Sequence, residues 1–454
     1  MNRLTNNAER KFRHISYAAV LSFCLPALAF AGEEQSTTSS VSSLSEKVEV
    51  KDETAKQVQE ANAEPAKWYA TPDKPLQIDA LFHAAVGWTD RKATNIDARP
   101  FFSVHRARLW FRGKVHDRVN YVLHLAFDRI GADEYAMLQA GPLGPARPLA
   151  VQDALVQYDV FGTKALRISA GFLRPNVGRE SNTPVPAVGT HEPGLTSFLA
   201  RRMTTGTGHG RAGGIDLGGR FENLAGDSLP LSLIYHAGAF TPTREGMGAD
   251  GTQYSNSLGL QGAPLFGGSL SLVFGSLSHM RAGDLLFLPN SWSKDWTVML
   301  GGAASAQMEN DFFDQTVVQS YYANASAYGV YFDGEFVTAE RKLSTGGRMS
   351  NQAYHARLGY NIWLDRSILS PFAMYTQLKG DDLSSIGTSA VDDFGMALGT
   401  GSLVDAGFNW HFRAHKLRAG FHVIYAMTED QGATAASQPI RDGWSSFVTL
   451  QVQR

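Results

Sequence analysis

The chain has almost no cysteine, and beyond its first residues it has no long apolar run. Its single cysteine, Cys24, lies in the N-terminal segment, so the rest of the chain offers neither a disulfide framework nor thiol chemistry. No later window approaches the roughly 18 consecutive apolar residues that a membrane-spanning helix needs. Composition therefore excludes a disulfide-stapled domain, a thiol enzyme and a helical membrane protein.

Residues 1–31 have the pattern of a secretory signal peptide. Four basic residues precede an apolar stretch, and the sequence ALAFA ends in small residues suited to cleavage after Ala31. Cys24 raises a lipoprotein alternative, but bulky Phe23 stands where a lipid-attachment signal needs a small residue. We therefore expect an exported protein.

A strong charge of one sign is also missing, since the formal net charge is −2. Residues 32–64 carry eight acidic residues against three lysines, a net charge of −5, and residues 65–454 are neutral. Nothing in this balance favours a nucleic-acid partner. Apolar residues at a spacing of three to four favour a short coiled coil within 32–68, and a flexible acidic periplasmic linker fits equally well.

From residue 69 onward, the sequence changes to short alternating segments separated by polar and glycine-rich clusters. In KLRAGFHVIYAMT (416–428) the odd-numbered residues Leu417 to Met427 form an apolar face, opposite Arg418 and His422. RVNYVLHLAFD and LRISAGFL alternate in the same way. A period of two over about ten residues is typical of a transmembrane β-strand.

The connections favour a barrel, because tight ones alternate with long ones such as 174–211, as periplasmic turns alternate with extracellular loops. The seventeen strand candidates are 77–88, 103–114, 118–128, 151–161, 165–173, 212–222, 229–240, 255–262, 268–279, 296–306, 318–327, 330–340, 352–363, 369–379, 402–412, 416–427 and 443–453.

A single-chain bacterial barrel has an even number of strands, so one candidate is surplus. Counting from both ends makes 268–279 run outward and 318–327 run inward, which assigns 296–306 to an extracellular loop. The sequence thus predicts an all-β fold, a 16-stranded antiparallel transmembrane barrel spanning residues 69–454 in the bacterial outer membrane. A barrel of this size leaves an aqueous channel.

The stretch FSVHRARLWFRGKV (102–115) places Arg106, Arg108 and Arg112 on one face of a strand. A lipid-facing arginine at the bilayer midplane costs about 2–4 kcal/mol, so the three side chains are expected to face the lumen. Two interpretations remain: a guided path for anions, or ordinary lumen arginines balanced by inward carboxylates. The same parity sends inward the arginines Arg167, Arg357 and Arg418, and the carboxylates Asp128, Asp153, Asp159, Asp333 and Glu335.

The 174–211 segment is far longer than a closing turn requires, and such loops are usually functional. We expect it to fold inward and constrict the pore, where basic residues would set selectivity. An exposed loop with solvated arginines is the alternative. The five basic residues that it carries are Arg174, Arg179, Arg201, Arg202 and Arg211.

The stretches VQDALVQYDVFGTKALRISAGFLRPNVGRES, GRAGGIDLGGRF and LIYHAGAFT resemble the phosphate-selective porin O/P family. The resemblance spans roughly residues 77–454 and implies a trimeric outer-membrane channel, in some members with an N-terminal periplasmic coiled coil. It places Arg174 and Arg211 at matched basic positions flanking the constriction loop. Two features depart from the family: the 174–211 loop has no lysine, and the chain ends FVTLQVQR without a terminal Phe.

The sequence therefore predicts a passive porin that prefers small anions such as phosphate. The expected partners are outer-membrane lipid, the assembly machinery and two further copies of the chain in a homotrimer, and no cofactor is expected. A general-diffusion porin and, less favoured, an outer-membrane barrel enzyme are the alternatives. Four loop carboxylates offer a Ca²⁺ site or simply a solvated surface: Asp381, Asp382, Asp392 and Asp393.

Overall fold

The structure is a computed structural model, and its described residues all belong to the compact unit Ala55–Arg454. The predicted signal peptide and the segment 32–68 lie outside them, as does the acidic loop at 381–399. The described ranges are 75–91, 96–128, 150–184, 187–205, 210–226, 230–241, 246–247, 253–254, 263–276, 280–281, 286–287, 289–290, 292–309, 313–343, 346–380, 400–413, 416–429 and 442–453.

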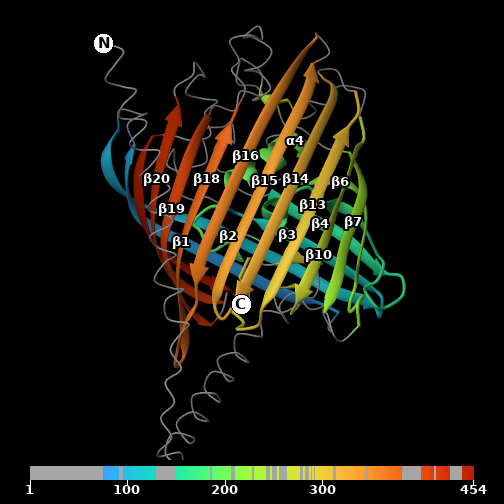
Figure 1. The fold of residues 1–454 in the computed structure, drawn as a ribbon, viewed down its shortest axis with the longest axis horizontal. Coiled ribbons are helices and arrows are strands. Elements are labelled where there is room, and N and C mark those ends of the chain that lie inside the picture. The colour runs from blue at the N-terminus through green and yellow to red at the C-terminus, as the bar shows by residue number, and fades with distance from the viewer. Residues whose placement is uncertain are drawn as a thin grey trace, which may run out of the picture. The chain divides into compact units, whose positions relative to one another are not determined.

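The chain forms a closed antiparallel barrel of 16 strands, which confirms the predicted fold class (Figure 1). Strand β17 (Ile362–Leu364) only continues β16 past Asn361, because both pair with β18. The wall strands are β1 (Gln77–Arg91), β2 (Ile96–His116), β3 (Val119–Ala126), β4 (Ala150–Asp159), β5 (Arg167–Leu173), β6 (Ala212–Phe221), β7 (Leu231–Thr241), β10 (Leu265–Gly275), β13 (Thr297–Gln307), β14 (Phe313–Ala327), β15 (Val330–Leu343), β16 (Gly347–Tyr360), β18 (Ser367–Lys379), β19 (Thr400–Arg413), β20 (Leu417–Glu429) and β21 (Gly443–Gln453).

Each wall strand pairs with its neighbour in the chain, and β1 pairs with β21 from Leu81↔Gln453 to Arg91↔Gly443 to close the barrel. The tight connections lie at the end where β1 starts and β21 finishes, which we name the turn end. Such turns are periplasmic in outer-membrane barrels. Two small ribbons lie in longer connections: β8 (Gly246–Met247) with β9 (Gln253–Tyr254), and β11 (Met280–Arg281) with β12 (Leu286–Phe287).

The predicted alternation is visible on β20. Val423, Tyr425 and Met427 are 40–49% exposed on the outer face, whereas Arg418 and His422 are buried on the lumen side. Burying the polar residues and exposing the apolar ones reverses the pattern of a soluble protein, and it fits a wall whose outer face meets lipid. No helix in the described part of the chain combines the length and apolar character needed to cross a bilayer.

One strand prediction is wrong. Strand β13 pairs along its whole length with β10 and β14, so 296–306 belongs to the wall and not to a loop. Strand β7 pairs directly with β10, which leaves no place between them for 255–262, a segment outside the described residues. Consequently β10 runs toward the turn end, opposite to the direction predicted for 268–279.

The misassignment follows from counting 255–262 as a wall strand, because that count reverses the direction given to 268–279. The small residues of β13 gave no signal against it. Gly301 lies against the ring of Tyr322 on β14, and a Cβ at that position would stand 2.2 Å from a ring carbon. A glycine in a strand often marks such a close approach. In the sequence alone, glycines and alanines carry no alternation that distinguishes a wall strand from a loop ribbon.

The connection between β5 and β6 enters the barrel, as predicted, and we name residues 174–211 the constriction loop. It contains a short helix α3 (Arg179–Asn182) and the longer α4 (Leu195–Thr205). Figure 1 shows α4 behind β14 and β15, and its contacts with β14, β15, β16 and β18 place it on the inner wall.

Candidate functional site

Helix α4 is seated on the inner wall by apolar packing. Its residues Leu195, Leu199 and Met203 lie four apart on one face and are fully buried. They pack against lumen-facing apolar side chains of the wall, so here the lumen side is not polar as the sequence predicted. Each fully buried Leu or Met contributes about 1.5–3 kcal/mol. The wall members of this cluster include Val318, Val337, Ala339, Ala353, Leu378 and Leu403.

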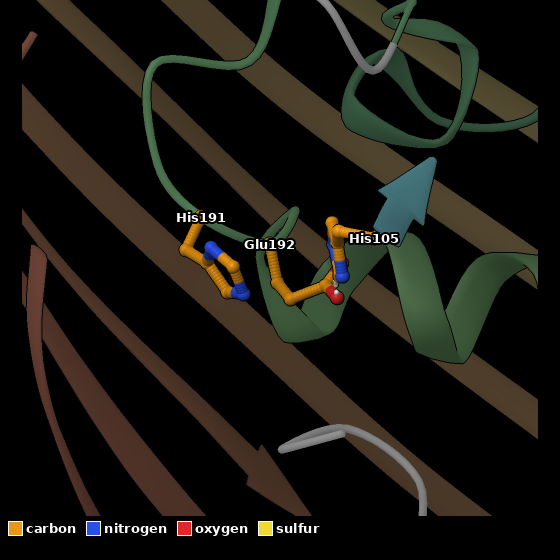
Figure 2. A group of neighbouring side chains, drawn as sticks. All are labelled: His105, His191 and Glu192. Carbon is orange, nitrogen blue, oxygen red and sulfur yellow. Dashed lines mark ion pairs between the residues drawn. The ribbon is translucent and has the colours of Figure 1, made fainter. Parts of the chain in front are cut away.

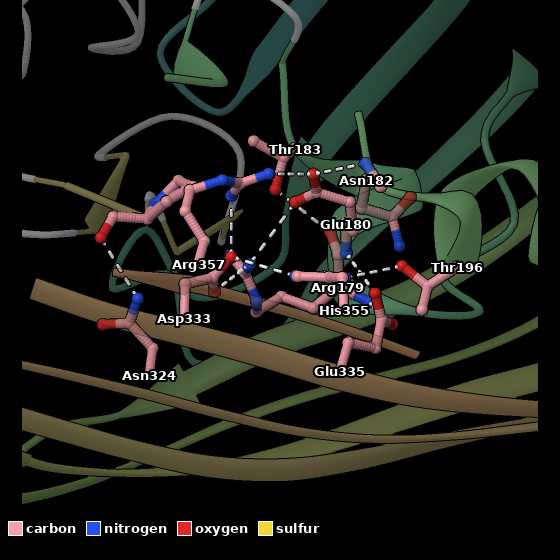
Figure 3. Close-up of polar contacts among 12 residues, drawn as sticks. Arg179, Glu180, Asn182, Thr183, Thr196, Asn324, Asp333, Glu335, His355 and Arg357 are labelled. Atoms are coloured by element: carbon pink, nitrogen blue, oxygen red, sulfur yellow. Dashed lines mark hydrogen bonds and ion pairs between the residues drawn. The ribbon is translucent and has the colours of Figure 1, made fainter. Parts of the chain in front are cut away.

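A buried ion-pair network holds α3 to the same wall (Figure 3). Arg357 on β16 pairs with Glu180 of α3 at 2.5 Å and with Asp333 of β15 at 2.7 Å, and all three side chains are fully buried. Arg179 contacts Asp333 and Glu180 as well. We name these four residues the loop anchor.

The start of α3 is also bound by a carboxylate. Glu335 accepts the backbone N–H groups of Arg179 and Glu180 at 2.7 and 3.0 Å. Burial alone would raise the pKa of Glu180, but Arg357, with His355 and Arg179, outweighs burial and lowers that pKa to about 2. The carboxylate therefore stays ionised at neutral pH, and its charge is compensated by fixed guanidinium groups.

The structure places the three arginines of β2 on the lumen side. Arg106, Arg108 and Arg112 are 5–8% exposed, and each faces a carboxylate. Arg112 Nε donates to Asp79 at 2.7 Å, and Arg108 Nε donates to Asp128 at 3.0 Å. These two contacts are local to the wall, so the positive potential of the row is largely compensated.

Arg106 reaches the tip of the constriction loop instead. It donates to Glu192 at 3.1 Å and to the His191 carbonyl at 3.3 Å. A β-bulge in β2 makes this possible, because the register with β1 shifts between His83↔Arg106 and Ala84↔Val104. The extra residue, His105, turns inward beside Arg106, a side-chain placement typical of bulges near functional sites.

The remaining predicted arginines are distributed around the lumen. Arg211 Nε donates to Asp153 at 3.0 Å. Arg418 donates to the Val188 carbonyl at 3.1 Å, and so ties β20 to the loop. Arg167 lies near the turn end in register with Asp159. Arg202 belongs to α4, but its side chain lies outside the part that the structure describes.

Arg174 and Arg201 converge on one backbone oxygen. Arg174 Nη1 donates to the Ser181 carbonyl at 2.6 Å, and Arg201 Nη2 donates to the same oxygen at 3.0 Å. Arg201 Nε is buried with no hydrogen-bond partner. Burial, then repulsion from Arg211, lowers the pKa of both guanidinium groups, that of Arg201 to about 9, so Arg201 remains charged at neutral pH.

Sequence reasoning singled out these two arginines but could not predict their convergence. It missed the histidines altogether as a group. His83, His105, His191 and His422 meet around the loop tip, with the rings of His105 and His191 stacked at 4.5 Å. The inward parity of His83 and His422 was visible in the alternation; the place of His191 depends on the folding of the loop.

A second segment enters the lumen from the turn end, within the β10–β13 connection. Trp292 is buried against Ile368, with Trp363 packed alongside. Asn290 and Asn361 exchange amide hydrogen bonds at 2.9 Å. We name the described residues 289–290 and 292–296 the turn-end segment. A small cavity separates it from the constriction loop, lined in part by Gly189, Tyr331, Asn409 and Arg418.

Comparisons with known proteins support the fold. No protein-family model matches the chain, and no curated protein matches it either. Three similar solved structures are a Salmonella typhi OmpF in complex with daunomycin (14% identity, TM-score 0.50), an anion-selective porin from Comamonas acidovorans (13%, 0.50) and Pseudomonas putida OprB (9%, 0.54). Each match covers 84% of this chain, and 97%, 99% and 95% of the respective structure.

At these identities the likeness is one of fold. Together with the apolar outer face and the lumen of paired charges, it leads to a plain conclusion. The chain is a bacterial outer-membrane β-barrel with the architecture of the porins.

Proposed function

We propose that the protein is a passive diffusion channel that prefers small anions, with phosphate or another oxyanion as the leading solute. The observation that carries this proposal is the convergence of Arg174 and Arg201 on the Ser181 carbonyl. Two guanidinium groups share one neutral acceptor, and neither pairs with a carboxylate among the residues that the structure describes. Guanidinium groups bind oxyanions bidentately and keep their charge, so this pair is suited to an anion arriving in the lumen.

The other arginines support the pair from a distance. Arg211 and Arg108 lie close enough to repel Arg201, so the positive potential is highest on this side of the loop. Asp128 and Asp153 compensate Arg108 and Arg211, which leaves the excess charge on the pair itself. Selectivity depends on the local potential at the narrowing and not on the net charge of the barrel.

The loop anchor and the β2 row have a different role in this proposal. Arg357, Arg179 and Arg112 each lie within 3.5 Å of a buried carboxylate, so we assign them to holding the loop and shaping the lumen. Arg106 and Arg418 fix the loop tip in the same way. The alternative is a general-diffusion porin. In such a channel every arginine of the lumen would be compensated by a carboxylate, as the arginines of the loop anchor are.

We also infer that the chain is not an enzyme. The His–Asp pairs of the described lumen have further partners that fix them in place. Asp153 holds both His124 and Arg211, and His236 contacts both Asp216 and Asn176. Such pairs are typical of a structured lumen wall.

We further propose that three copies form a homotrimer in outer-membrane lipid after insertion by the assembly machinery. In this proposal residues 1–31 are a signal peptide, 32–68 a periplasmic linker or coiled coil, and 69–454 the barrel. Membership of the phosphate-selective porin O/P family is part of the same proposal, and it rests on the strand motifs and the basic constriction loop.

Reversal potentials in planar bilayers under a KCl gradient test the selectivity. We expect anion preference in the wild type and its loss in an Arg174→Gln, Arg201→Gln double variant. A charge about 4 Å from an ion contributes about 1 kcal/mol in water-like surroundings, so each guanidinium is worth a factor of about five in permeability ratio. Phosphate should block the chloride current of the wild type more strongly than that of the variant.

The matched control is Arg348→Gln, because Arg348 is exposed and pairs with Glu340 outside the lumen constriction. It should leave the reversal potential unchanged. Cation preference in the wild type, or selectivity that survives the double variant, would favour the general-diffusion porin.

A further inference from the structure

The tip of the constriction loop meets the barrel wall in a group of metal-ligating side chains that the anion pathway does not use. His105 comes from the β2 bulge, and His191 and Glu192 from the loop between α3 and α4. Figure 2 shows the three side chains grouped at the loop tip. One donor atom from each residue lies within 4.8 Å of the other two.

We propose that His105, His191 and Glu192 form a binding site for a divalent transition-metal ion of the Zn²⁺ class, which fastens the loop tip to β2. Two imidazoles and one carboxylate are a donor set that suits Zn²⁺ and its neighbours, whereas Mg²⁺ and Ca²⁺ prefer oxygen ligands alone. The proposal does not depend on the selectivity of the channel.

The geometry requires only a small closure of the loop tip. His105 Nε2 and Glu192 Oε1 are 3.0 Å apart. Zinc bonds of about 2.0–2.1 Å in a tetrahedral arrangement separate the ligand atoms by about 3.3 Å. This pair therefore already has nearly the separation that a shared ion imposes, and the His191 ring has to approach it from at most 4.8 Å.

Neighbouring residues hold these ligands in position. Arg106 binds the other carboxylate oxygen of Glu192, Oε2, and so orients Oε1 toward His105. Asp405 accepts the backbone N–H of His191 at 2.9 Å, and the ring of Phe447 stacks on the His191 imidazole at 4.3 Å. Partners of this kind orient ligands and tune their affinity.

The ring of His191 has a nitrogen that the protein leaves unused. Its Nδ1 is buried without a hydrogen-bond partner, and so is Nε2 of the neighbouring His83. Other lumen side chains, His124 and His236 among them, also have such an atom, so this nitrogen shows that a ligand atom is available and the grouping of the three side chains carries the proposal. Burial, then the neighbouring His105, lowers the pKa of His191 well below its ordinary value, so the imidazole is neutral and able to bind a metal at neutral pH.

The positively charged guanidinium of Arg106 lies beside Glu192 and repels a bound metal cation. The three ligands must therefore supply the attraction that holds the ion. Glu192 supplies the compensating negative charge: burial would raise its pKa, but His105 and Arg106 hold that pKa well below the usual range. The carboxylate is therefore ionised and shared between Arg106 and the proposed ion.

Titration of the full chain, folded in detergent and freed of metal by a chelator, tests the site. We expect ZnCl₂ to bind in a single saturable step by calorimetry. CoCl₂ should give the ligand-field absorption of a four-coordinate ion. His105→Gln and His191→Gln should each weaken Zn²⁺ binding by more than the roughly 10–100-fold loss typical of replacing a residue that only orients a ligand. Glu192→Gln should weaken it as well.

His236→Gln is the matched control, since His236 is a buried lumen histidine paired with Asp216 and is not a member of the His105, His191 and Glu192 group. It should bind Zn²⁺ as the wild type does. Heat-modifiable mobility on gels verifies folding of each variant, and His191→Gln carries the test if the wall variant fails to fold. Absence of saturable Zn²⁺ binding to the wild type, or Zn²⁺ binding as tight as that of the wild type in the folded His105→Gln and His191→Gln variants, would overturn the proposal.

Discussion

Two segments enter the lumen of this barrel, and they are held by different physics. The constriction loop is fastened by the fully buried charges of the loop anchor and by the apolar face of α4. The turn-end segment is held by an Asn290–Asn361 amide pair and by the packing of Trp292. The constriction loop is thus held by charged and apolar contacts together, and the turn-end segment by neutral polar and aromatic contacts.

The backbone of the turn-end segment adds to the contrast. Trp292 has a φ of 56°, a left-handed conformation that costs a bulky residue about 1–3 kcal/mol. Its burial therefore works against backbone strain, whereas the burial of the loop anchor works against the desolvation of its charges, which the ion pairs offset. The comparison indicates a permanent constriction at mid-lumen and a more easily released element at the turn end.

The largest expected effect comes from breaking the loop anchor. Arg357→Ala leaves Glu180 and Asp333 as buried, undercompensated carboxylates, and removing one partner of a buried pair costs about 3–5 kcal/mol. We expect a lower midpoint of denaturant unfolding and a larger, noisier single-channel conductance. Arg348→Ala on the same strand removes an exposed ion pair with Glu340 that is worth about 0–1 kcal/mol. This variant should change neither the midpoint of unfolding nor the conductance. Equal effects of the two variants would refute the anchor.

A smaller and more local effect is expected at the turn end. Trp292→Ala removes the aromatic packing and should lower the free energy of unfolding by up to about 3 kcal/mol. This is the low end for such substitutions, because the segment can detach from the wall instead of leaving a cavity. Hydrogen exchange should rise across the described residues 292–296 while β13 stays protected. Trp296→Ala serves as control, since Trp296 is 47% exposed. Uniform loss of protection across the wall would show that the segment is part of the global fold.

The smallest effect is expected from moderate acid. The pKa of Glu180, lowered to about 2, gives the folded state on the order of 3 kcal/mol that is fully present above the unfolded-state pKa near 4.5. That contribution is lost only as the pH falls toward 2. Hydrogen exchange of α3, corrected for its intrinsic pH dependence, should therefore be similar at pH 7 and pH 5. A clear loss of protection at pH 5 would mean that the anchor is not ionised as described.

Much of the fold followed from alternation. The strands of β2, β3 and β20 were predicted with the correct inward residues, because lipid outside and water inside impose opposite side-chain types on adjacent positions. The count of 16 strands was correct for a reason of parity, yet the strand excluded was the wrong one. An even number of strands is needed to close the barrel, but this requirement does not identify which candidate segment pairs with its neighbours in the wall.

The candidate site was predictable in composition and not in arrangement. The arginines of the constriction loop were named from its length and charge, but Arg179 lies in the loop anchor, and Arg174 and Arg201 share one carbonyl. These distinctions depend on how α3 turns within the lumen. The histidine group at the loop tip gave no local pattern, because its members come from β1, β2, β20 and the loop.

The sequence by itself therefore determined the alternating wall, the inward row of Arg106, Arg108 and Arg112, and the existence of a long basic loop, and it predicts an export signal. These are consequences of local patterns and of the cost of a charge in lipid, which act on each strand separately. Only the tertiary structure decided that β13 lies in the wall, that the β2 bulge turns His105 inward, and that Glu180 meets Arg357 across 177 positions of sequence. Such contacts are made between segments distant in the chain, and they exist only when the barrel closes around the loop.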